Sequence, residues 1–447
     1  MLMEFLDTLD GYIWGLPMIL LLMGTGLWLT VRLNLIQVVK LIPALKLIFN
    51  SENKGEGDVN PFKALCVALA ATVGTGNIVG VATAVKTGGP GALFWMWVAA
   101  FLGMATKFAE CMLAVKYREI DENGNVCGGP MYYIKNGMGE GWGWLAKMFA
   151  LFGMLAGIMG IGTLTQVNSI TDIVNIATGW DPTIVCFAIA ILVAIIIFGG
   201  LQSIANASSA IVPFMAVVYI LATLGLLVMN ADKVPAAFSM IINDAFTGTA
   251  ATGGFIGSSI MLAMRSGVAR GIFSNESGLG SAPIVAAAAK TNWAAEQGLV
   301  SMTGTFIDTI IICTLTGLSL VVTGVWCGPL KGAAMTNAAF MTAYPAWGTY
   351  ILTVALALFA FSTILGWAYY SERCAEYLFG IKCIFPYRAM FVIAVASSAS
   401  LQLEEIWCLA DIFNGLMAFP NLVALLALSP VVVSETKAYY DYLKNKK

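Results

Sequence analysis

Long runs of apolar residues recur along the chain, with shorter polar segments between them. The runs lack the alternation of apolar and polar residues, over about ten positions, that marks a strand of a membrane β-barrel. A helix needs about 20 apolar residues to cross the hydrocarbon of a bilayer, so the runs predict membrane-spanning helices. Eleven spans are predicted, at 12–36, 62–86, 90–116, 143–177, 182–199, 203–229, 258–289, 297–325, 343–371, 385–402 and 407–433.

Three predicted spans are longer than one straight crossing requires and are expected to be tilted, bent or interrupted. They are 143–177, 258–289 and 343–371. The longer segments between spans are polar, and they lie at 37–61, 117–142, 230–255 and 372–384. Because no separate soluble domain is evident, residues 1–447 are interpreted as a single transmembrane domain.

The composition agrees with a surface that faces lipid. Hydrophobic residues make up 59% of the 447 residues and charged residues 11%, against about 25% charged in a soluble protein. There is no histidine and no Cys-x-x-Cys pair among the nine cysteines, which argues against a zinc or haem enzyme. Neither a basic face nor a Gly-x-x-x-x-Gly-Lys loop is present, so nucleic acids and nucleotides are not expected partners.

Lysine and arginine collect in the segments that would lie on one side of a membrane. Cytoplasmic loops carry an excess of these residues, and the asymmetry predicts a multi-pass cell-membrane protein with its N-terminus outside and its C-terminus in the cytoplasm. The outside segments then hold Lys86, Lys233 and Lys331. The inside segments hold Arg32, Lys40, Lys46, Lys54, Lys63, Lys116, Arg118, Lys135, Lys147, Lys290, Arg373, Lys382, Arg388, Lys437, Lys444, Lys446 and Lys447.

Two predicted spans contain polar, glycine-rich motifs that a continuous helix would not favour. Residues 70–80 read Ala-Ala-Thr-Val-Gly-Thr-Gly-Asn-Ile-Val-Gly, and residues 270–283 read Arg-Gly-Ile-Phe-Ser-Asn-Glu-Ser-Gly-Leu-Gly-Ser-Ala-Pro. A glycine inside a helix costs on the order of 1 kcal/mol relative to alanine, and polar residues inside a membrane usually mark function. Close helix packing through small residues is the alternative, and it is favoured for Gly80 alone. Together, the motifs predict two broken helices.

A broken helix offers two kinds of polar backbone group to a ligand. Unwinding frees carbonyl groups that can coordinate a cation, and the new helix N-termini present N–H groups to an anion. A zwitterionic amino acid together with Na⁺ matches this combination. Its carboxylate is expected on the N–H groups of residues 74–77, and its ammonium on the carbonyls near Thr72 and Phe273 and on the Ser274 hydroxyl.

The order of the broken spans indicates an inverted repeat. The first broken span begins a set of five spans over 62–229, and the second begins another set of five over 258–433. Because five spans separate the two starts, the sets have opposite topology and would share a site near the bilayer midplane. The segment 12–36 is then an extra N-terminal helix.

These motifs resemble those of known transporter families. Residues 73–77, Val-Gly-Thr-Gly-Asn, resemble a motif of the neurotransmitter:sodium symporters, and the helix order resembles the LeuT-type 5+5 inverted repeat. More fully, residues 74–82, 128–133 and 273–280 resemble hallmarks of the alanine or glycine:cation symporter family, also called sodium/alanine symporters. The resemblance covers about residues 10–435. It implies an all-α polytopic membrane protein of the LeuT-type fold.

The resemblance also implies two neighbouring binding sites. Na⁺ would be held by the carbonyls of Ala70, Val73 and Phe359 and by the hydroxyls of Ser362 and Thr363. For these two hydroxyls the alternative is a hydrogen bond back to the preceding helical turn. The substrate would contact Thr72, Thr75, Gly76, Asn77, Gln166, Phe273, Ser274, Asn275 and Trp367.

Two of these substrate contacts carry specific expectations. Trp367 lies one helical turn beyond Thr363, where a bulky indole would shorten the pocket and favour alanine or glycine over leucine; a role as packing against core or lipid is the alternative. Gln166 interrupts the middle of its span and is expected to contact substrate, with an interhelical hydrogen bond as the alternative.

Several charged residues within the spans have less defined expectations. Glu276 would accept N–H groups freed by the break or tune a gate, and Asp308 would hold a coupling cation or bond to a neighbouring helix. Glu110 and Lys107 are expected to be solvated or paired. Arg265 and Arg270, at the outer half of 258–289, would form part of an outer gate.

The sequence therefore predicts a secondary active transporter that carries a small neutral amino acid, alanine of either hand or glycine, with Na⁺ as the coupling ion. Proton coupling is the alternative. A channel is less well supported because the two breaks are unlike and lie in one pseudo-repeat rather than in a repeated pore motif. An enzyme is not expected, because no nucleophile–base pair is evident. The expected partners are the amino acid and the lipid bilayer, and no obligate protein partner is inferred.

Overall fold

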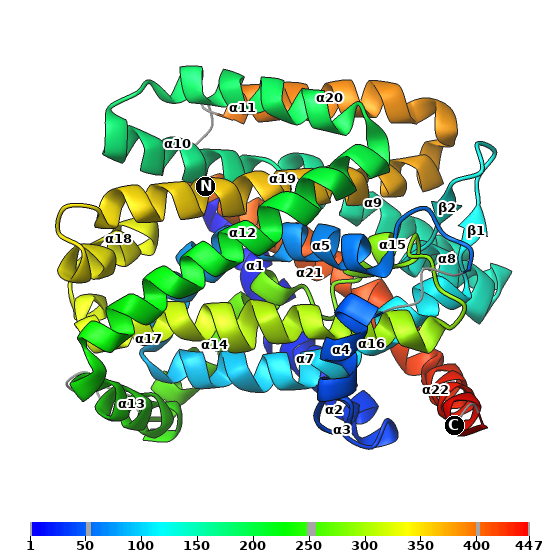
Figure 1. The fold of residues 1–447 in the computed structure, drawn as a ribbon, viewed down its shortest axis with the longest axis horizontal. Coiled ribbons are helices and arrows are strands. Elements are labelled where there is room, and N and C mark those ends of the chain that lie inside the picture. Colours follow the sequence, from blue (N-terminus) through cyan, green and yellow to red (C-terminus); the bar gives the residue numbers. More distant parts are fainter. Residues whose placement is uncertain (1, 51–54, 248–255, 399–402, 446–447) are drawn as a thin grey trace.

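The computed structural model describes residues 2–50, 55–247, 256–398 and 403–445, which are almost entirely helical (Figure 1). Two short strands, β1 (Glu119–Ile120) and β2 (Val126–Cys127), form an antiparallel hairpin. In chain order the helical segments are α1 (Leu2–Ile13), α2 (Leu16–Arg32), α3 (Ile36–Val39), α4 (Leu41–Asn50), α5 (Pro61–Thr72), η1 (Gly76–Gly80), α6 (Val81–Gly88), α7 (Gly91–Lys116), α8 (Pro130–Tyr133), η2 (Ile134–Met138), η3 (Glu140–Trp142), α9 (Gly143–Met159), α10 (Leu164–Thr178), α11 (Pro182–Ile197), α12 (Gly200–Met229), η4 (Ala231–Lys233), α13 (Val234–Thr247), α14 (Ile256–Asn275), α15 (Ala282–Ala286), α16 (Ala294–Thr305), η5 (Phe306–Cys313), α17 (Thr314–Thr323), η6 (Val325–Cys327), α18 (Gly332–Ala343), α19 (Gly348–Phe379), η7 (Ile381–Cys383), α20 (Ile384–Ser397), α21 (Leu403–Ala427) and α22 (Ser429–Asn445).

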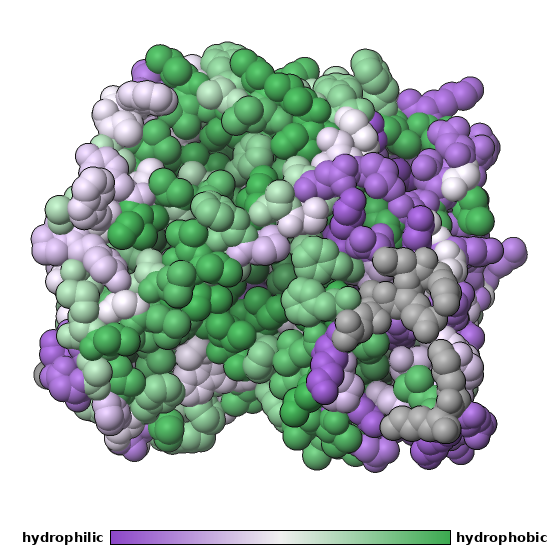
Figure 2. All heavy atoms as spheres, viewed as in Figure 1, coloured by the Kyte–Doolittle hydropathy of each residue, from purple (hydrophilic) through white to green (hydrophobic). Residues whose placement is uncertain are grey.

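The surface matches the predicted contact with lipid. Large apolar side chains are exposed along α11 and α12, for example Ile191, Ile195 and Leu221. Apolar residues cover the middle of the face in Figure 2, and hydrophilic residues gather at the right-hand end, where Figure 1 places the β1–β2 hairpin and α8. Among the described residues, seven helices are long and apolar enough to cross a membrane, or eight if α5 with η1 and α6 counts as one bent span. The count of eleven spans stays a prediction.

The first predicted break is present. Helix α5 ends at Thr72, and Val73 leaves the helical conformation with φ −77° and ψ 88°. The chain then resumes as the π-helical segment η1 and as α6, bent by 50° relative to α5. The glycines and polar residues of 72–77 therefore coincide with an unwound segment.

The second predicted break is also present. Helix α14 ends at Asn275, and the short helix α15 begins only at Ala282. Three residues between them have left-handed backbone: Glu276 at φ +56°, Gly278 at +91° and Gly280 at +83°. Glycine adopts this conformation without steric cost, whereas a glutamate there is uncommon and is stabilised by its surroundings.

The two broken spans lie side by side and run in opposite directions. Helix α6, the second half of the first span, packs against α14, the first half of the second, while α5 packs against α15. Helix α7 packs along α14, α15 and α16, and α19 packs against α5, α9, α10 and α12. The antiparallel pairing is compatible with an inverted repeat, whose limits of 62–229 and 258–433 stay predictions.

Of the three long spans, two are interrupted and one is not. The chain breaks at 160–163 between α9 and α10 and at 276–281 between α14 and α15. By contrast, α19 is one continuous helix of 32 residues that ends at Phe379. The polar segment predicted at 372–384 is therefore helical over its first half. The prediction was wrong there because its charged residues are buried and paired, as in Arg373 with Glu376 at 2.6 Å.

The other polar segments contain structure that the apolar pattern did not reveal. Helix α4 lies within 37–61 and α3 overlaps its start, the hairpin and α8 lie within 117–142, and α13 lies within 230–255. The last predicted span ends earlier than expected, at Ala427, and α22 follows it. Residues 51–54, 248–255 and 399–402 lie outside the described residues, as do Lys54, Lys446 and Lys447.

Candidate functional site

The residues predicted for the two binding sites are all buried, although they come from five separate segments of the chain. These segments are the end of α5, η1, the start of α10, the end of α14 and the middle of α19. The buried residues are Ala70, Thr72, Val73, Thr75, Gly76, Asn77, Gln166, Phe273, Ser274, Asn275, Phe359, Ser362, Thr363 and Trp367. A convergence of polar residues inside an apolar bundle is the geometry expected of a transporter site.

Four of the five oxygens predicted to bind Na⁺ form one cluster, and the contacts that join them do not include the Val73 carbonyl. The Thr363 hydroxyl donates to the carbonyls of Ala70 and Phe359, each at 3.1 Å. The Ser362 hydroxyl also donates to the Phe359 carbonyl, at 2.9 Å. Both hydroxyls therefore make the backbone bond to their own helix that was the alternative interpretation. In addition, Thr363 reaches across to the broken span.

The Ala70 carbonyl is available because the helix is broken at the next turn. In a continuous helix it would accept the Gly74 N–H, but that N–H donates at 2.8 Å to the side-chain oxygen of Asn77. Gly74 itself lies directly against Thr363, since a Cβ added at Gly74 would overlap the Thr363 hydroxyl. Thus the unwound segment and the oxygen cluster are in direct contact.

The polar groups at the first break have few other partners. The Thr75 N–H donates to the Gln166 side-chain oxygen over 3.4 Å, a long hydrogen bond. In the part of the chain that the structure describes, the buried Thr75 hydroxyl has no hydrogen-bond partner. The Thr72 hydroxyl, by contrast, donates back to the Ala68 carbonyl in its own helix at 3.1 Å. Thr75 and Gln166 therefore offer polar atoms at the break that a ligand can use.

The two breaks touch each other. A Cβ placed on Gly76 would lie 3.0 Å from Ser274 Cα and 3.4 Å from the Phe273 ring. The absence of a side chain at Gly76 lets the two backbones approach this closely. The helical residues that flank the two breaks are therefore in direct contact.

Asp308 joins the polar side chains of the two breaks. Its carboxylate accepts hydrogen bonds from Asn77 at 2.7 Å, Ser274 at 2.9 Å and Thr309 at 2.7 Å. The Asn275 amide donates to Thr309 at 3.0 Å. Asp308 lies on the π-helical segment η5. The sequence predicted a role for Asp308 because it is a carboxylate within an apolar run. It did not predict Thr309 or the π-helix, because the spacing of apolar residues does not distinguish a π-helix from an α-helix.

A second buried network stabilises the unwound residues of 276–281. Glu276 accepts a hydrogen bond from the Trp367 indole at 2.7 Å and one from Ser281 at 2.5 Å. Glu110 accepts the Gly278 N–H at 3.0 Å and the Asn421 amide at 2.5 Å. Glu276 therefore joins the unwound segment to α19 through its hydrogen bond with Trp367. The Trp367 indole thus has a structural role that does not depend on contact with substrate.

The expectation that Lys107 is solvated or paired was wrong. Its side chain is buried at 3% exposure, and among the described residues its ammonium has no hydrogen-bond partner. Glu110, one turn further along α7, is paired but not solvated, since it is 0% exposed. Lys107 lay near the predicted end of its span, and its burial depends on helices α14 and α16 packing over α7, which the sequence does not reveal.

One side of the site opens into a cavity of about 550 Å³. Its lining includes residues of η1, α10, α14, α18 and α21. At its base Arg270 pairs with Asp411 at 2.5 Å, and the Phe273 ring lies against Trp407 at 5.4 Å between ring centres. Arg265 lines a smaller adjoining pocket. Arg265 and Arg270 therefore line the cavities on this side of the bundle, and their role in an outer gate stays a prediction.

The opposite side of the site is closed by backbone hydrogen bonds between the broken spans. The Asp58 N–H donates to the Ala288 carbonyl, and the Lys290 N–H to the Val59 carbonyl, each at 2.8 Å. The Arg118 guanidinium donates to the carbonyls of Ala287 and Ala289. This end of the bundle is therefore sealed while the other is hollow.

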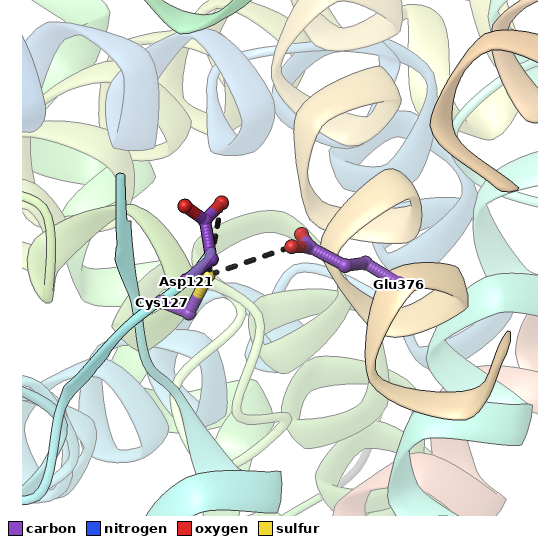
Figure 3. A group of neighbouring side chains, drawn as sticks. All are labelled: Asp121, Cys127 and Glu376. Atoms are coloured by element: carbon purple, nitrogen blue, oxygen red, sulfur yellow. Dashed lines mark hydrogen bonds between the residues drawn. The ribbon is translucent and has the colours of Figure 1, made fainter. Parts of the chain in front are cut away.

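The β1–β2 hairpin adds an ionic contact at the sealed end. Figure 3 shows Asp121 and Cys127 of the hairpin region facing Glu376 of α19. Arg373 lies 2.6 Å from Glu376 and 3.6 Å from Asp121, and it also donates to Cys127. The grouping of two carboxylates and a thiol is one that a metal could use, but here the guanidinium already supplies the positive charge.

Comparison with known proteins decides the family. The model of the sodium:alanine symporter family matches residues 1–447. The chain belongs to this family. A symporter of Methanococcus maripaludis named "Sodium/alanine symporter AgcS" is 51% identical over 99% of this chain and 98% of its own. A Haemophilus influenzae protein named "Uncharacterized transporter" is 55% identical over 99% of this chain and 97% of its own.

The solved structure of an Eremococcus coleocola manganese transporter mutant superposes with a TM-score of 0.52. The alignment covers 84% of this symporter and 78% of that chain at 12% identity, so it is evidence for the fold alone. It confirms the predicted LeuT-type class. Membership of the family likewise confirms a membrane-embedded transporter rather than an enzyme, with Na⁺ as the coupling ion.

Proposed function

We propose that this symporter carries alanine, and other amino acids of similar size, together with Na⁺ through a site between the two breaks. The observation that carries the proposal is the oxygen cluster of Ala70, Phe359 and Thr363, which lies directly against Gly74 of the unwound segment. The printed name of the 51% identical relative, a sodium/alanine symporter, supports the choice of substrate.

Na⁺ would bind at the oxygen cluster. Its ligands would be the carbonyls of Ala70, Val73 and Phe359 and the hydroxyls of Ser362 and Thr363. A single hydroxyl proton on Thr363 serves two carbonyls, so lone pairs remain for a cation. A cluster of neutral oxygens without a carboxylate suits a monovalent ion that must also be released.

The amino acid would bind next to the ion. Its carboxylate would take N–H groups of residues 74–77, first replacing the long hydrogen bond between Thr75 and Gln166. Its ammonium would take the carbonyls near Thr72 and Phe273 and the Ser274 hydroxyl, and the Thr75 hydroxyl supplies a further polar contact. The remaining contacts of the predicted set come from Gly76, Asn77, Gln166, Asn275 and Trp367.

The size limit follows from what surrounds this position. Phe273 closes the outer side by packing against Trp407, and the buried indole of Trp367 is held in place by Glu276. Neither ring can move away without losing these contacts. A methyl side chain fits such a pocket better than a branched one, so alanine and glycine are favoured over leucine.

Transport would proceed by alternating access between two five-helix sets, 62–229 and 258–433. The open outer cavity and the sealed opposite end correspond to an outward-facing state with its site covered. This interpretation puts the N-terminus outside and the C-terminus in the cytoplasm.

The orientation is checked by Cys327, which is exposed between α17 and α18. An impermeant maleimide should label this cysteine in intact cells, and the label should be lost in the control Cys327→Ser. Labelling of Cys327 only after the cells are permeabilised would contradict the orientation.

Proton coupling is a second candidate, because three buried carboxylates lie near the breaks. Glu110, Glu276 and Asp308 are each 0% exposed. Each, however, already accepts at least two hydrogen bonds from neighbouring donors, so all three carboxylates have structural partners around the breaks. The oxygen cluster beside Gly74 contains no carboxylate, which favours Na⁺ over a proton as the ion bound there.

An equilibrium binding series tests the substrate and the ion together. The purified symporter is titrated with radiolabelled L-alanine in NaCl and in KCl of equal ionic strength, at one pH below and one above neutrality. We expect binding only in NaCl, little dependence on pH, competition by glycine and D-alanine, and none by leucine. Equal binding in KCl, or binding that follows pH instead of Na⁺, would contradict Na⁺ coupling.

A further inference from the structure

A pocket of about 350 Å³ lies where the end of α2 and the helix α3 meet α22, away from the transport site. Four basic residues line it: Arg32, Lys40, Lys437 and Lys444. They come from two segments that are far apart in the sequence, residues 32–40 and residues 437–444. The pocket has no role in the proposed transport cycle, so its concentration of positive charge needs another explanation.

The charges that face this pocket leave a clear excess of positive charge. Asp441 is the acidic residue in its lining, and it lies 3.9 Å from Lys444 in an exposed pair. The Lys40 ammonium lies 4.2 Å from the centre of the Tyr440 ring, which holds it at the pocket. Glu435, earlier on the same helix, is paired with Lys116 at 2.6 Å. The pocket therefore favours an anion.

The backbone at the rim is constrained in a way that builds the pocket. Asn34 and Leu35 have left-handed φ values of +52° and +56°, which is uncommon for a residue with a side chain and unusual for leucine. The Leu35 N–H donates back to the Thr30 carbonyl at 2.9 Å. This sharp turn reverses the chain between α2 and α3, so that Lys40 returns to the side of Arg32. Strained backbone of this kind is often found at binding sites.

One wall of the pocket continues into a surface that faces lipid. Val31, Leu35, Val38, Val39 and Ile42 are exposed by 48–68% on α2, α3 and α4. The Trp28 indole, one turn before the pocket, donates to Ser429 at 3.2 Å and lies under the Arg32 guanidinium. Tryptophan in this position is typical of the membrane–water interface. The pocket therefore sits at the level of lipid headgroups.

We propose that this pocket binds the phosphate headgroup of an anionic phospholipid, with the acyl chains lying along the exposed apolar residues of α2, α3 and α4. The phosphate oxygens would accept hydrogen bonds from Lys40, Lys437 and Arg32. Basic pockets at the ends of membrane spans bind lipid headgroups through this chemistry. Inorganic phosphate could accept the same hydrogen bonds, but it has no acyl chains to contact the exposed apolar residues of α2, α3 and α4.

The test is lipid binding to the full-length symporter, measured by native mass spectrometry in detergent. Phosphatidylglycerol and phosphatidylcholine with the same acyl chains, and inorganic phosphate, are titrated separately. We expect phosphatidylglycerol to bind more tightly than the other two. Removing one to two basic residues is expected to lower the affinity by about one order of magnitude. K40Q/K437Q removes two of them and should bind phosphatidylglycerol about 30-fold more weakly.

Two further variants make the result specific. K147Q/K382Q removes two exposed lysines outside the pocket and should bind phosphatidylglycerol like the unaltered chain. K40R/K437R keeps both charges and should also retain it, which separates loss of charge from loss of fold. The proposal is overturned if phosphatidylcholine binds equally well, if inorganic phosphate binds as tightly as the lipid, or if K40Q/K437Q and K147Q/K382Q behave alike.

Discussion

Gly74→Ala should reduce Na⁺-driven alanine uptake by tenfold to about 100-fold. The added methyl group would overlap the Thr363 hydroxyl and lie 3.4 Å from the Gln166 side-chain oxygen. To avoid it, either Thr363 leaves the Ala70 carbonyl or the unwound segment shifts away from α19. Overpacking of this kind costs about 1–3 kcal/mol, and here the cost falls on the geometry of both binding sites.

Gly80→Ala is the matched control, since Gly80 lies in the same span but has no atom within 4 Å of an added Cβ. This variant should transport alanine like the unaltered symporter, because alanine is the better helix former. Uptake by proteoliposomes, normalised to protein content, measures both variants. If Gly74→Ala and Gly80→Ala kept equal activity, the contact between the unwound segment and Thr363 would not matter for transport.

Thr363→Ala should raise the Na⁺ concentration needed for half-maximal alanine uptake by about tenfold to 100-fold. The substitution removes a side chain that joins the Ala70 carbonyl of the broken span to the Phe359 carbonyl of α19. A hydrogen bond or ligand to a charged group contributes about 1.5–3 kcal/mol. The maximal rate at saturating Na⁺ should change less, because the substrate contacts at the first break remain.

Two companions distinguish an ion ligand from a packing residue. Thr363→Ser keeps the oxygen and should restore most of the Na⁺ affinity. Thr353→Ala, on the same helix, removes a hydroxyl that donates to the Thr349 carbonyl one turn back and should leave Na⁺ dependence unchanged. An unaltered Na⁺ response in Thr363→Ala would remove this residue from the ion site.

Both breaks could be predicted from the sequence because their causes are local. Glycines next to threonine, asparagine and serine inside an apolar run are unfavourable for a helix, wherever the run packs. The composition of residues 72–77 and 273–280 therefore predicts unwound backbone without any knowledge of tertiary contacts. The family resemblance then linked Ser362 and Thr363 to the first break, a pairing that no local pattern contains.

Features that depend on packing could not be predicted. The burial of Lys107 and the helical continuation of α19 through Arg373 both rest on neighbouring segments that cover charged side chains. The same holds for Asp308, whose carboxylate bonds to Asn77 and Ser274 only because η5 passes both breaks. A charge within an apolar run signals a function, but its partners come from the fold.

The most direct test of the account is the driving force for alanine accumulation. The purified symporter is reconstituted into liposomes, and radiolabelled alanine uptake is followed with an inward Na⁺ gradient and equal pH on both sides, then with an inward proton gradient and no Na⁺. The account predicts that alanine is concentrated above the external level only with the Na⁺ gradient, and that a Na⁺ ionophore abolishes the accumulation. Concentration of alanine by the proton gradient alone, or mere equilibration under both conditions, would contradict it.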